Sequence, residues 1–391
     1  MQAGDLAAWE ILRTLVAFDT TSRESNLALI DWVRDWLWRH GVDSTLTYDD
    51  DRRKANLFAT LPAQDGNAVT GGIVLSGHTD VVPVDGQPWT RPPFAATPEG
   101  ERVYGRGVAD MKGFCATALA MVPTFLRRDL SRPLHLALSY DEEVGCIGVR
   151  RLISDIDARG VRPLGCIVGE PTGNEIVVAH KGKKSWRCRV RGREAHSALT
   201  PLGVNAVEIA CEIVSRLSAM ARARRDGGPF DRGYDVAYTT VHTGTIRGGT
   251  ALNIVPRDCA FEFEIRHLPF DDPDALFREI ETHARALLPA MHAVDPECFI
   301  EFDLLSTMPG FEAAPGSEIA ALGHACNGHP GAGKVSFGSE ASRFHAAAIP
   351  TVLCGPGRIA QAHQPDEWVA VAELAACEAF MHRLADRICS G

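Results

Sequence analysis

The sequence predicts an α/β protein in which a sheet domain covered by helices is interrupted by a smaller inserted domain. The chain has 391 residues, more than one hydrophobic core usually organises, so two domains are expected. In the first and last parts of the chain, short apolar strands alternate with amphipathic helices, which is typical of a mainly parallel sheet. The middle part has a different order of strands and helices, which indicates a separate compact unit.

The first part, residues 1–183, begins with apolar residues at helical spacing from 5 to 38 and continues with an apolar run at 72–76. These patterns predict helix followed by a buried strand. The next predicted elements are helices at 111–126 and 145–153 and strands at 134–140 and 166–169. Alternation of this kind indicates an α/β layer with a substantially parallel sheet.

The middle part, residues 184–307, is predicted to be the inserted domain. Its predicted elements are a strand at 185–190, a helix at 205–221, strands at 238–246 and 260–265, a helix at 274–287 and a strand at 299–304. The order β-α-β-β-α-β is that of a ferredoxin-like α+β sandwich, which is large enough to fold as one unit. Residues 308–391 then resume the first domain, with a helix at 317–326, a strand at 350–353 and a helix at 371–388.

Composition and charge exclude several classes of function. With 45% hydrophobic residues, the chain still has no apolar run near the roughly 20 residues of a membrane-spanning helix. A net charge of −10 argues against nucleic-acid binding, which needs a clustered basic surface. The N-terminal stretch mixes Asp5 and Glu10 with apolar positions, so no signal peptide is expected. The 11 cysteines form no CxxC pair, which favours reduced thiols in the cytoplasm over disulfides.

Polar residues that can bind a metal ion follow the predicted strands. In a doubly wound sheet, functional groups gather just past the carboxyl ends of the strands, so residues from distant parts of the sequence are expected to meet there. Taken singly, each motif is also compatible with a structural histidine or a charged turn, and it is their coincidence that carries the prediction. The candidate groups are His78, Asp80, Asp110, Glu142, Glu143, Glu170 and His363.

The chemistry of these residue types suits a divalent ion such as zinc, which accepts imidazole nitrogen and carboxylate oxygen. Asp80 is close enough in sequence to His78 to accept the second N–H of a metal-bound imidazole. The adjacent side chains of Glu142 and Glu143 diverge, so one can hold a metal while the other moves protons. Such a site can activate water and polarise a carbonyl group.

Short motifs extend in a fixed order over nearly the whole chain. They are GHTDVVP at 77–83, GRGVADMKG at 105–113, DEE at 141–143 and GEPT at 169–172, with further motifs at 180–182, 193–197, 252–256 and 355–367. Together they resemble the acetylornithine deacetylase and succinyl-diaminopimelate desuccinylase family of dizinc amidohydrolases. The resemblance implies a zinc-aminopeptidase-like α/β/α catalytic domain with an inserted lid and dimerisation domain.

The resemblance also implies which residues hold the metals. His78, Asp110 and Glu170 are expected to hold one zinc ion. Asp110, Glu143 and His363 are expected to hold the other, so that Asp110 bridges the pair, and cobalt is expected to be able to replace zinc.

Other roles follow from the same resemblance. Glu142 is expected to be the general base that deprotonates the attacking water, and Asp80 is expected to orient His78. The peptide bond after Asp110 is expected to be cis. His196, in the inserted domain, is expected to polarise the scissile carbonyl in the active site of the partner subunit, which makes a homodimer part of the mechanism.

Three further residues are candidates for substrate contact. Arg266 offers a bidentate fork to an α-carboxylate, and Asn253 lies in one of the motifs, although either could be structural. Glu340 could pair with the side-chain ammonium of ornithine, or it could anchor the helix that follows it.

The substrate expectation comes from segments 85–87, 139–146 and 360–365, which look closest to acetylornithine deacetylase. They imply hydrolysis of N2-acetyl-L-ornithine to L-ornithine and acetate, a step of arginine biosynthesis in the cytoplasm. The alternatives are a desuccinylase, a general acylamino-acid hydrolase, a dipeptidase, or a catalytically silent binding protein of the same fold. A serine or cysteine nucleophile is disfavoured because no Gly-x-Ser-x-Gly elbow or known cysteine motif is present.

Overall fold

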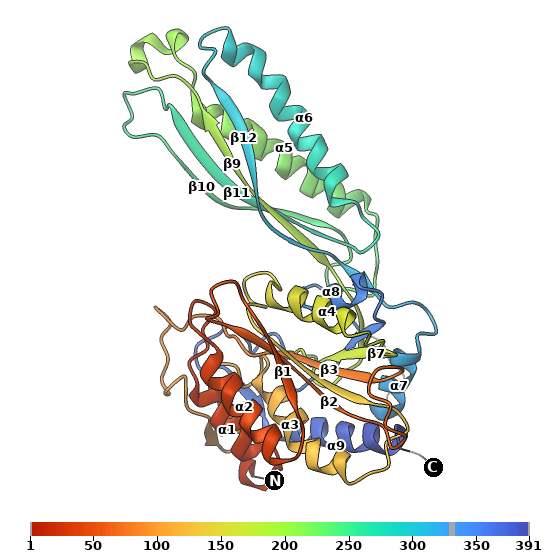
Figure 1. Cartoon of the computed structure of the whole chain (residues 1–391). Helices are drawn as coiled ribbons and strands as arrows, with labels where there is room; N and C mark the ends of the chain where they lie inside the picture. Colours follow the sequence, from red (N-terminus) through yellow and green to blue (C-terminus); the bar gives the residue numbers. More distant parts are fainter. Residues whose placement is uncertain (1, 328–332, 390–391) are drawn as a thin grey trace. The chain divides into compact units, whose positions relative to one another are not determined.

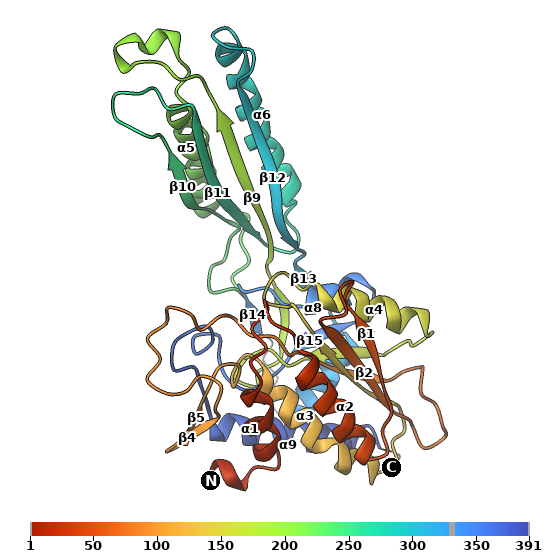
Figure 2. The ribbon, with the colours of Figure 1, turned by 60° about the vertical axis from the view of Figure 1, so that its left-hand side comes forward.

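The computed structural model describes residues 2–327 and 333–389, which form two compact units (Figures 1 and 2). Unit 1 comprises Met1–Ala179, Phe311–Lys334 and Ser339–Gly391, and unit 2 comprises His180–Gly310 and Val335–Gly338. Unit 2 begins before the predicted boundary at 184 because its first strand starts at Gly182. Among the helices of the described ranges, none has the length and apolar character needed to cross a membrane.

Unit 1 is built on a sheet with the strand order β1-β2-β6-β3-β7-β15-β8-β13, and β14 pairs with β8. The strands β6, β3, β7 and β15 at its centre are parallel to one another, so their carboxyl ends lie at one edge of the sheet. Their apolar side chains are buried because helices cover both faces. The bounds are β1 Ser44–Tyr48, β2 Ala55–Leu61, β3 Ile73–His78, β6 Leu134–Ser139, β7 Gly165–Val168, β8 Val177–His180, β13 Phe311–Glu312, β14 Gly333–Val335 and β15 Thr351–Leu353.

The helices of unit 1 lie in two layers. Figure 1 shows α4 and α8 on one face of the sheet and α1, α2, α3 and α9 on the other, which confirms the predicted α/β/α arrangement. Helix α3 packs against α1, α9 and strand β3, so most of its residues are buried. The bounds are η1 Ala3–Asp5, α1 Trp9–Ala17, α2 Leu27–Arg39, α3 Lys112–Leu126, α4 Gly148–Ala158, α7 Glu318–Asn327, α8 Ala341–Ala346 and α9 Val371–Arg387, and a small sheet adds β4 Thr97–Glu99, β5 Arg102–Tyr104 and β16 Trp368–Ala370.

Unit 2 has the predicted order β-α-β-β-α-β. Its antiparallel sheet runs β10-β11-β9-β12, and α5 and α6 cover one face of it (Figure 1). Large side chains fill the space between sheet and helices, and Trp186 stacks on Phe277 with 4.7 Å between ring centroids. The bounds are β9 Gly182–Arg191, η2 Ser197–Leu202, α5 Ala206–Gly227, β10 Thr240–Gly248, β11 Asp258–His267, α6 Pro273–His292 and β12 Phe299–Met308.

One prediction of secondary structure was wrong. Residues 5–38 do not form continuous helix, because α1 ends at Ala17 and α2 begins at Leu27. The intervening segment makes tertiary hydrogen bonds instead: the Thr20 hydroxyl donates to the backbone carbonyl of Thr79 at 2.6 Å, and the Ser22 hydroxyl donates to Asp80 at 2.7 Å. Periodicity continued on both sides of this break and therefore concealed it.

Candidate metal centre

The carboxyl ends of the parallel strands position most of the candidate ligands. His78 is the last residue of β3, Glu143 follows β6, and Glu170 follows β7. Asp110 lies directly before α3, and the peptide bond between Asp110 and Met111 is cis, as predicted. Gly169 keeps Glu170 close to this helix, since a Cβ atom at Gly169 would meet the ring of Phe114 at 1.9 Å.

The inner group of candidate ligands consists of His78, Asp110 and Glu170, which are all buried. Each offers one ligand atom, and these atoms lie within 4.8 Å of one another. The His78 Nε2 atom is 3.0 Å from Asp110 Oδ1. Within the described chain, Glu170 Oε1 is buried without a hydrogen-bond partner. A buried carboxylate oxygen without a partner is costly, so its place beside an imidazole and a second carboxylate fits a metal ligand.

The outer group consists of Asp110, Glu143 and His363, whose ligand atoms also lie within 4.8 Å of one another. The His363 Nε2 atom is 3.3 Å from Asp110 Oδ2 and 3.1 Å from Glu143 Oε1. Asp110 therefore presents one oxygen to each group, which is the geometry that a bridging ligand needs. The side chain of His363 is 46% exposed, so this group opens towards solvent, in contrast to the inner group.

The electrostatics of the cluster favour bound cations. Burial, together with the charge of Asp110, raises the pKa of Glu143 to about 6. Burial, together with the charge of Asp110, also holds the pKa of Glu170 well above its usual range. Hydrogen bonds to Asp110 and Glu143 raise the pKa of His363 to about 10. The crowded carboxylates thus favour protonation of Glu143, Glu170 and His363, and bound divalent ions can replace these protons. The donor set of imidazole and carboxylate fits zinc.

Glu142 lies beside the ligands without belonging to either group. Its side chain is buried, and burial raises its pKa to about 8, with the neighbouring charge of Glu143 contributing. The thiol of Cys146 donates a hydrogen bond to Glu142 Oε1 at 3.0 Å. One carboxyl oxygen is thereby fixed, and the other is available for proton transfer.

Asp80 contacts His78 through its backbone. The His78 Nδ1 atom lies 2.9 Å from the backbone carbonyl oxygen of Asp80, whereas the Asp80 carboxylate is 3.7 Å away. The carboxylate instead accepts the backbone N–H groups of Glu142 at 3.0 Å and Glu143 at 3.3 Å, as well as the Ser22 hydroxyl at 2.7 Å. Asp80 therefore organises the turn that carries the candidate base and an outer ligand.

The remaining candidates lie elsewhere. Glu340 is fully buried, and its oxygens accept the hydroxyls of Ser76 at 2.7 Å and Ser139 at 2.6 Å, which favours the anchoring role considered for it over substrate contact.

His196, Asn253 and Arg266 belong to unit 2. The first two are exposed on neighbouring segments, where the Ser197 backbone N–H donates to the Asn253 carbonyl at 3.0 Å, and Arg266 pairs with Glu264 at 2.8 Å.

Comparison with known proteins identifies the family. Residues 74–387 match peptidase family M20/M25/M40, which covers most of the chain. The chain belongs to this family. This chain is 33% identical over 380 residues to an acetylornithine deacetylase of Proteus mirabilis. The match covers 96% of this chain and 94% of that protein. Membership of this family and the similarity to acetylornithine deacetylases show that this chain is a metal-dependent amidohydrolase.

Solved structures show the same fold. Aminopeptidase PepT of Bacillus cereus matches the M20 chain with a TM-score of 0.74 and 22% identity, covering 97% of this chain and 98% of that one. The Bacillus subtilis YXEP protein, a dinuclear metal-binding peptidase of family M20, matches with a TM-score of 0.68 and 13% identity over 98% of both chains.

Sequence reasoning missed several residues that hold the site of the M20 chain together. Ser22 supports Asp80, and Lys54 donates to Asp141 at 2.5 Å, beside the candidate base. Arg106 and Glu367 form an ion pair at 2.7 Å in which each side chain is only 1% exposed. Arg106 and Glu367 lie inside quoted motifs, which could have marked them, whereas Ser22 and Lys54 lie outside every motif and carried no such signal.

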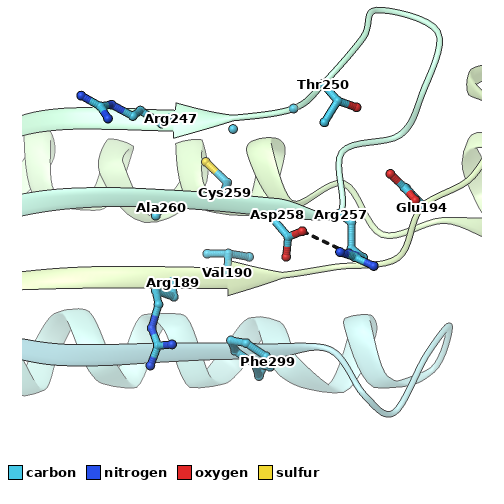
Figure 3. A pocket seen from close by; sticks show the side chains of 12 residues that line it. Arg189, Val190, Glu194, Arg247, Thr250, Arg257, Asp258, Cys259, Ala260 and Phe299 are labelled. Atoms are coloured by element: carbon cyan, nitrogen blue, oxygen red, sulfur yellow. Dashed lines mark hydrogen bonds and ion pairs between the residues drawn. The ribbon is translucent and has the colours of Figure 1, made fainter.

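Unit 2 of the M20 chain also contains a surface pocket, shown in Figure 3. Arg189, Arg257 and Arg247 contribute to its lining. The first two arginines are already paired with carboxylates, Arg257 with Asp258 at 3.1 Å and Arg189 with Glu301 and Asp303 at 3.0 Å each. This pairing neutralises most of the positive charge, so the pocket offers little attraction to an anion.

Proposed function

We propose that the protein hydrolyses N2-acetyl-L-ornithine to L-ornithine and acetate with two divalent metal ions. The observation that carries this proposal is the pair of ligand groups that share Asp110, with the buried carboxyl of Glu142 beside them. Similarity to acetylornithine deacetylases over nearly the whole chain supports the substrate. The product supports a role in arginine biosynthesis.

The proposed metals are zinc ions, which cobalt can replace in the same ligands. His78 and Glu170 would hold one ion, Glu143 and His363 the other, and Asp110 both. When bound, such ions polarise an acyl carbonyl and lower the pKa of water, so that a water molecule becomes a nucleophile near neutral pH.

The proton transfers belong to Glu142 in this proposal. Its free carboxyl oxygen takes a proton from the attacking water, while Cys146 holds the other oxygen. The water oxygen bonds to the acetyl carbon, the carbon–nitrogen bond then breaks, and Glu142 returns the proton to the departing amine. The hydrogen bond from the Glu142 backbone N–H to Asp80 fixes the origin of this side chain.

Unit 2 is proposed to recognise the substrate and to form a homodimer. The His196 Nδ1 atom accepts the backbone N–H of Ala198 at 3.1 Å, which places the ring proton on Nε2. From there it can donate a hydrogen bond to the scissile carbonyl of a substrate in the active site of the partner subunit. The exposed side chains of Leu199 and Leu202 on the following helix η2 favour an apolar interface with a second copy.

Asn253 and Arg266 are the proposed substrate contacts of unit 2. Arg266 pairs with Glu264, and its forked guanidinium suits the α-carboxylate of an acylated amino acid.

The proposed compartment is the cytoplasm. All 11 cysteines are free, including pairs of buried thiols in both units, and this state suits a reducing environment.

A panel of acylated substrates tests the reaction. Zinc-loaded protein should hydrolyse N-acetylornithine with a higher kcat/KM than N-succinyl-diaminopimelate, N-acetylmethionine or simple dipeptides. Preference for one of the others would replace the proposed substrate, and no hydrolysis of any would indicate a silent binding protein.

The role of Glu142 is tested separately by substitution. Glu142→Gln should keep both metal ions and lower kcat by about 10²–10⁴-fold, since general acid–base catalysis contributes about that much. Glu297→Gln, at an exposed site in unit 2, is the matched control and should be neutral. Normal turnover by Glu142→Gln would reject the assignment.

A further inference from the structure

The outer ligand His363 lies on a segment whose backbone is held by residues 87–91. The side-chain amide of Gln87 donates to the His363 backbone carbonyl at 3.0 Å. Asp366, three residues further on, accepts the backbone N–H of Thr90 at 3.0 Å, its hydroxyl at 2.6 Å and the backbone N–H of Arg91 at 3.2 Å. Four hydrogen bonds therefore connect the two segments.

The held segment needs such support because its backbone is strained. His363 has φ = 60° and Asp366 has φ = 53°, and both lie in the left-handed region that residues other than glycine rarely adopt. Such conformations are unfavourable and persist only where the surroundings impose them. The exposed imidazole of His363 has little packing of its own to fix it, since 46% of the side chain is open to solvent.

Two hydrogen bonds set the orientation of Gln87. Its Oε1 atom accepts hydrogen bonds from Arg106 at 2.6 Å and from the Trp89 indole at 2.9 Å. Because both partners are donors, the amide nitrogen of Gln87 is the atom that faces the His363 carbonyl.

The same network reaches the bridging ligand. Arg106 pairs with Glu367, and the other Glu367 oxygen accepts the backbone N–H groups of Ala109 at 3.0 Å and Asp110 at 3.2 Å. A continuous series of hydrogen bonds thus runs from the backbone of Asp110 to the backbone of His363. His78 is held differently, by strand β3 and by the Asp80 carbonyl.

We propose that Gln87 is a positioning residue that sets the affinity of the outer metal position and leaves the inner position unaffected. This inference rests on the proposed two-metal function. Loss of the Gln87 donor removes the one of the four hydrogen bonds that is made to His363 itself, while His78 and Glu170 keep all their contacts. Partners that orient metal ligands typically contribute about 10–100-fold in metal affinity, and a loss of that size at one of the two positions is expected.

Calorimetric titration of chelator-treated protein with zinc tests the proposal. Wild-type protein should take up two equivalents. Gln87→Glu keeps the acceptor for Arg106 and Trp89 but has no donor for His363, so it should bind one equivalent as wild type does and the second about 10–100-fold more weakly. Gln87→Leu removes the donor to His363 and the acceptor of Arg106 together, so it should weaken the second equivalent at least as much as Gln87→Glu does. The matched control is Gln64→Leu, at an exposed site in the same unit, which should bind both equivalents normally.

A second variant separates positioning from misfolding. Thr90→Val removes the hydroxyl bond to Asp366 at an exposed position and keeps the side-chain volume, so it should fold normally and weaken the same equivalent. Cobalt absorption spectra should show that the inner ion keeps its coordination in every variant.

The outcomes distinguish failure of the positioning role from failure of the proposed function. If wild type binds two equivalents and the Gln87 variants bind both with unchanged affinity, the positioning role is overturned and the proposed function stands. If wild type binds fewer than two equivalents, the two-metal function and the positioning role both fail. Equal weakening of both equivalents would also overturn the inference, since it predicts selectivity for the outer position.

Discussion

Replacement of Asp80 by Asn distinguishes two ways in which this residue could support catalysis. The sequence pattern suggests that its carboxylate orients His78, but the structure gives that hydrogen bond to the backbone carbonyl, which the substitution retains. The carboxylate oxygens accept the backbone N–H groups of Glu142 and Glu143. An amide has one accepting oxygen, so in either orientation of Asn one of these N–H groups faces an NH2 group.

The size of the effect follows from these contacts. A hydrogen bond to a charged group contributes about 1.5–3 kcal/mol. If that free energy is what holds Glu142 in its catalytic position, Asp80→Asn lowers kcat by about 10–100-fold, since about 1.36 kcal/mol corresponds to a factor of ten. The inner metal ion should remain bound, because neither His78 nor Glu170 loses a partner.

The assay is kcat for N-acetylornithine together with zinc content after dialysis. Ser22→Ala is the matched control: it removes the hydroxyl bond to Asp80 and keeps both backbone N–H bonds, so its kcat should fall less than that of Asp80→Asn. The proposed role of the Asp80 carboxylate is refuted if dialysed Asp80→Asn protein has lost the inner ion and regains normal kcat when it is reloaded with excess zinc. That result would assign the carboxylate to His78 after all.

Three further predictions concern the base, acid stability and metal removal. Cys146→Ala should lower kcat about tenfold with normal zinc content, because Glu142 loses a donor, and Cys146→Ser should restore most of the activity. Burial lowers the pKa of His135 to about 4, so the unfolded chain binds the proton first as pH falls below about 6.5. The free energy of unfolding, measured with urea, should therefore fall as the pH is lowered from about 6 to 4. Its slope should be steeper in wild type than in His135→Gln by up to about 1.4 kcal/mol per pH unit, and equal slopes would contradict this. Zinc at about 100 times its Kd should stabilise chelator-treated protein by about 2.7 kcal/mol, and an unchanged thermal midpoint would contradict binding to the folded state.

The candidate ligands could be grouped from the sequence most directly where the motif was local. His78 and Glu143 lie at or just after buried strands, and parallel strands deliver their ends to one edge of a sheet, so spacing alone brought these residues together. His363 lies ten positions beyond the end of β15 at Leu353, so the position of this strand end alone does not place it in the site, and its expected role as a ligand came from the family resemblance.

The supporting contacts were not predictable from one sequence. Ser22 and Asp80 are separated by 58 positions, and Arg106 and Glu367 by 261. Nothing local in either partner indicates the pairing, because a buried ion pair exists only once the fold has brought the two charges together. The break between α1 and α2 was missed for the same reason: its polar residues find their partners in the neighbouring loops after β3.

The point at which unit 2 departs from unit 1 has an evolutionary consequence. The chain leaves after β8 and returns in β13, and these two strands are neighbours in the sheet. All five candidate metal ligands lie outside the excursion between them. If unit 2 recognises the substrate as proposed, changes within residues 180–310 that keep His196 can alter which acylated molecule is accepted and leave the candidate metal ligands in place.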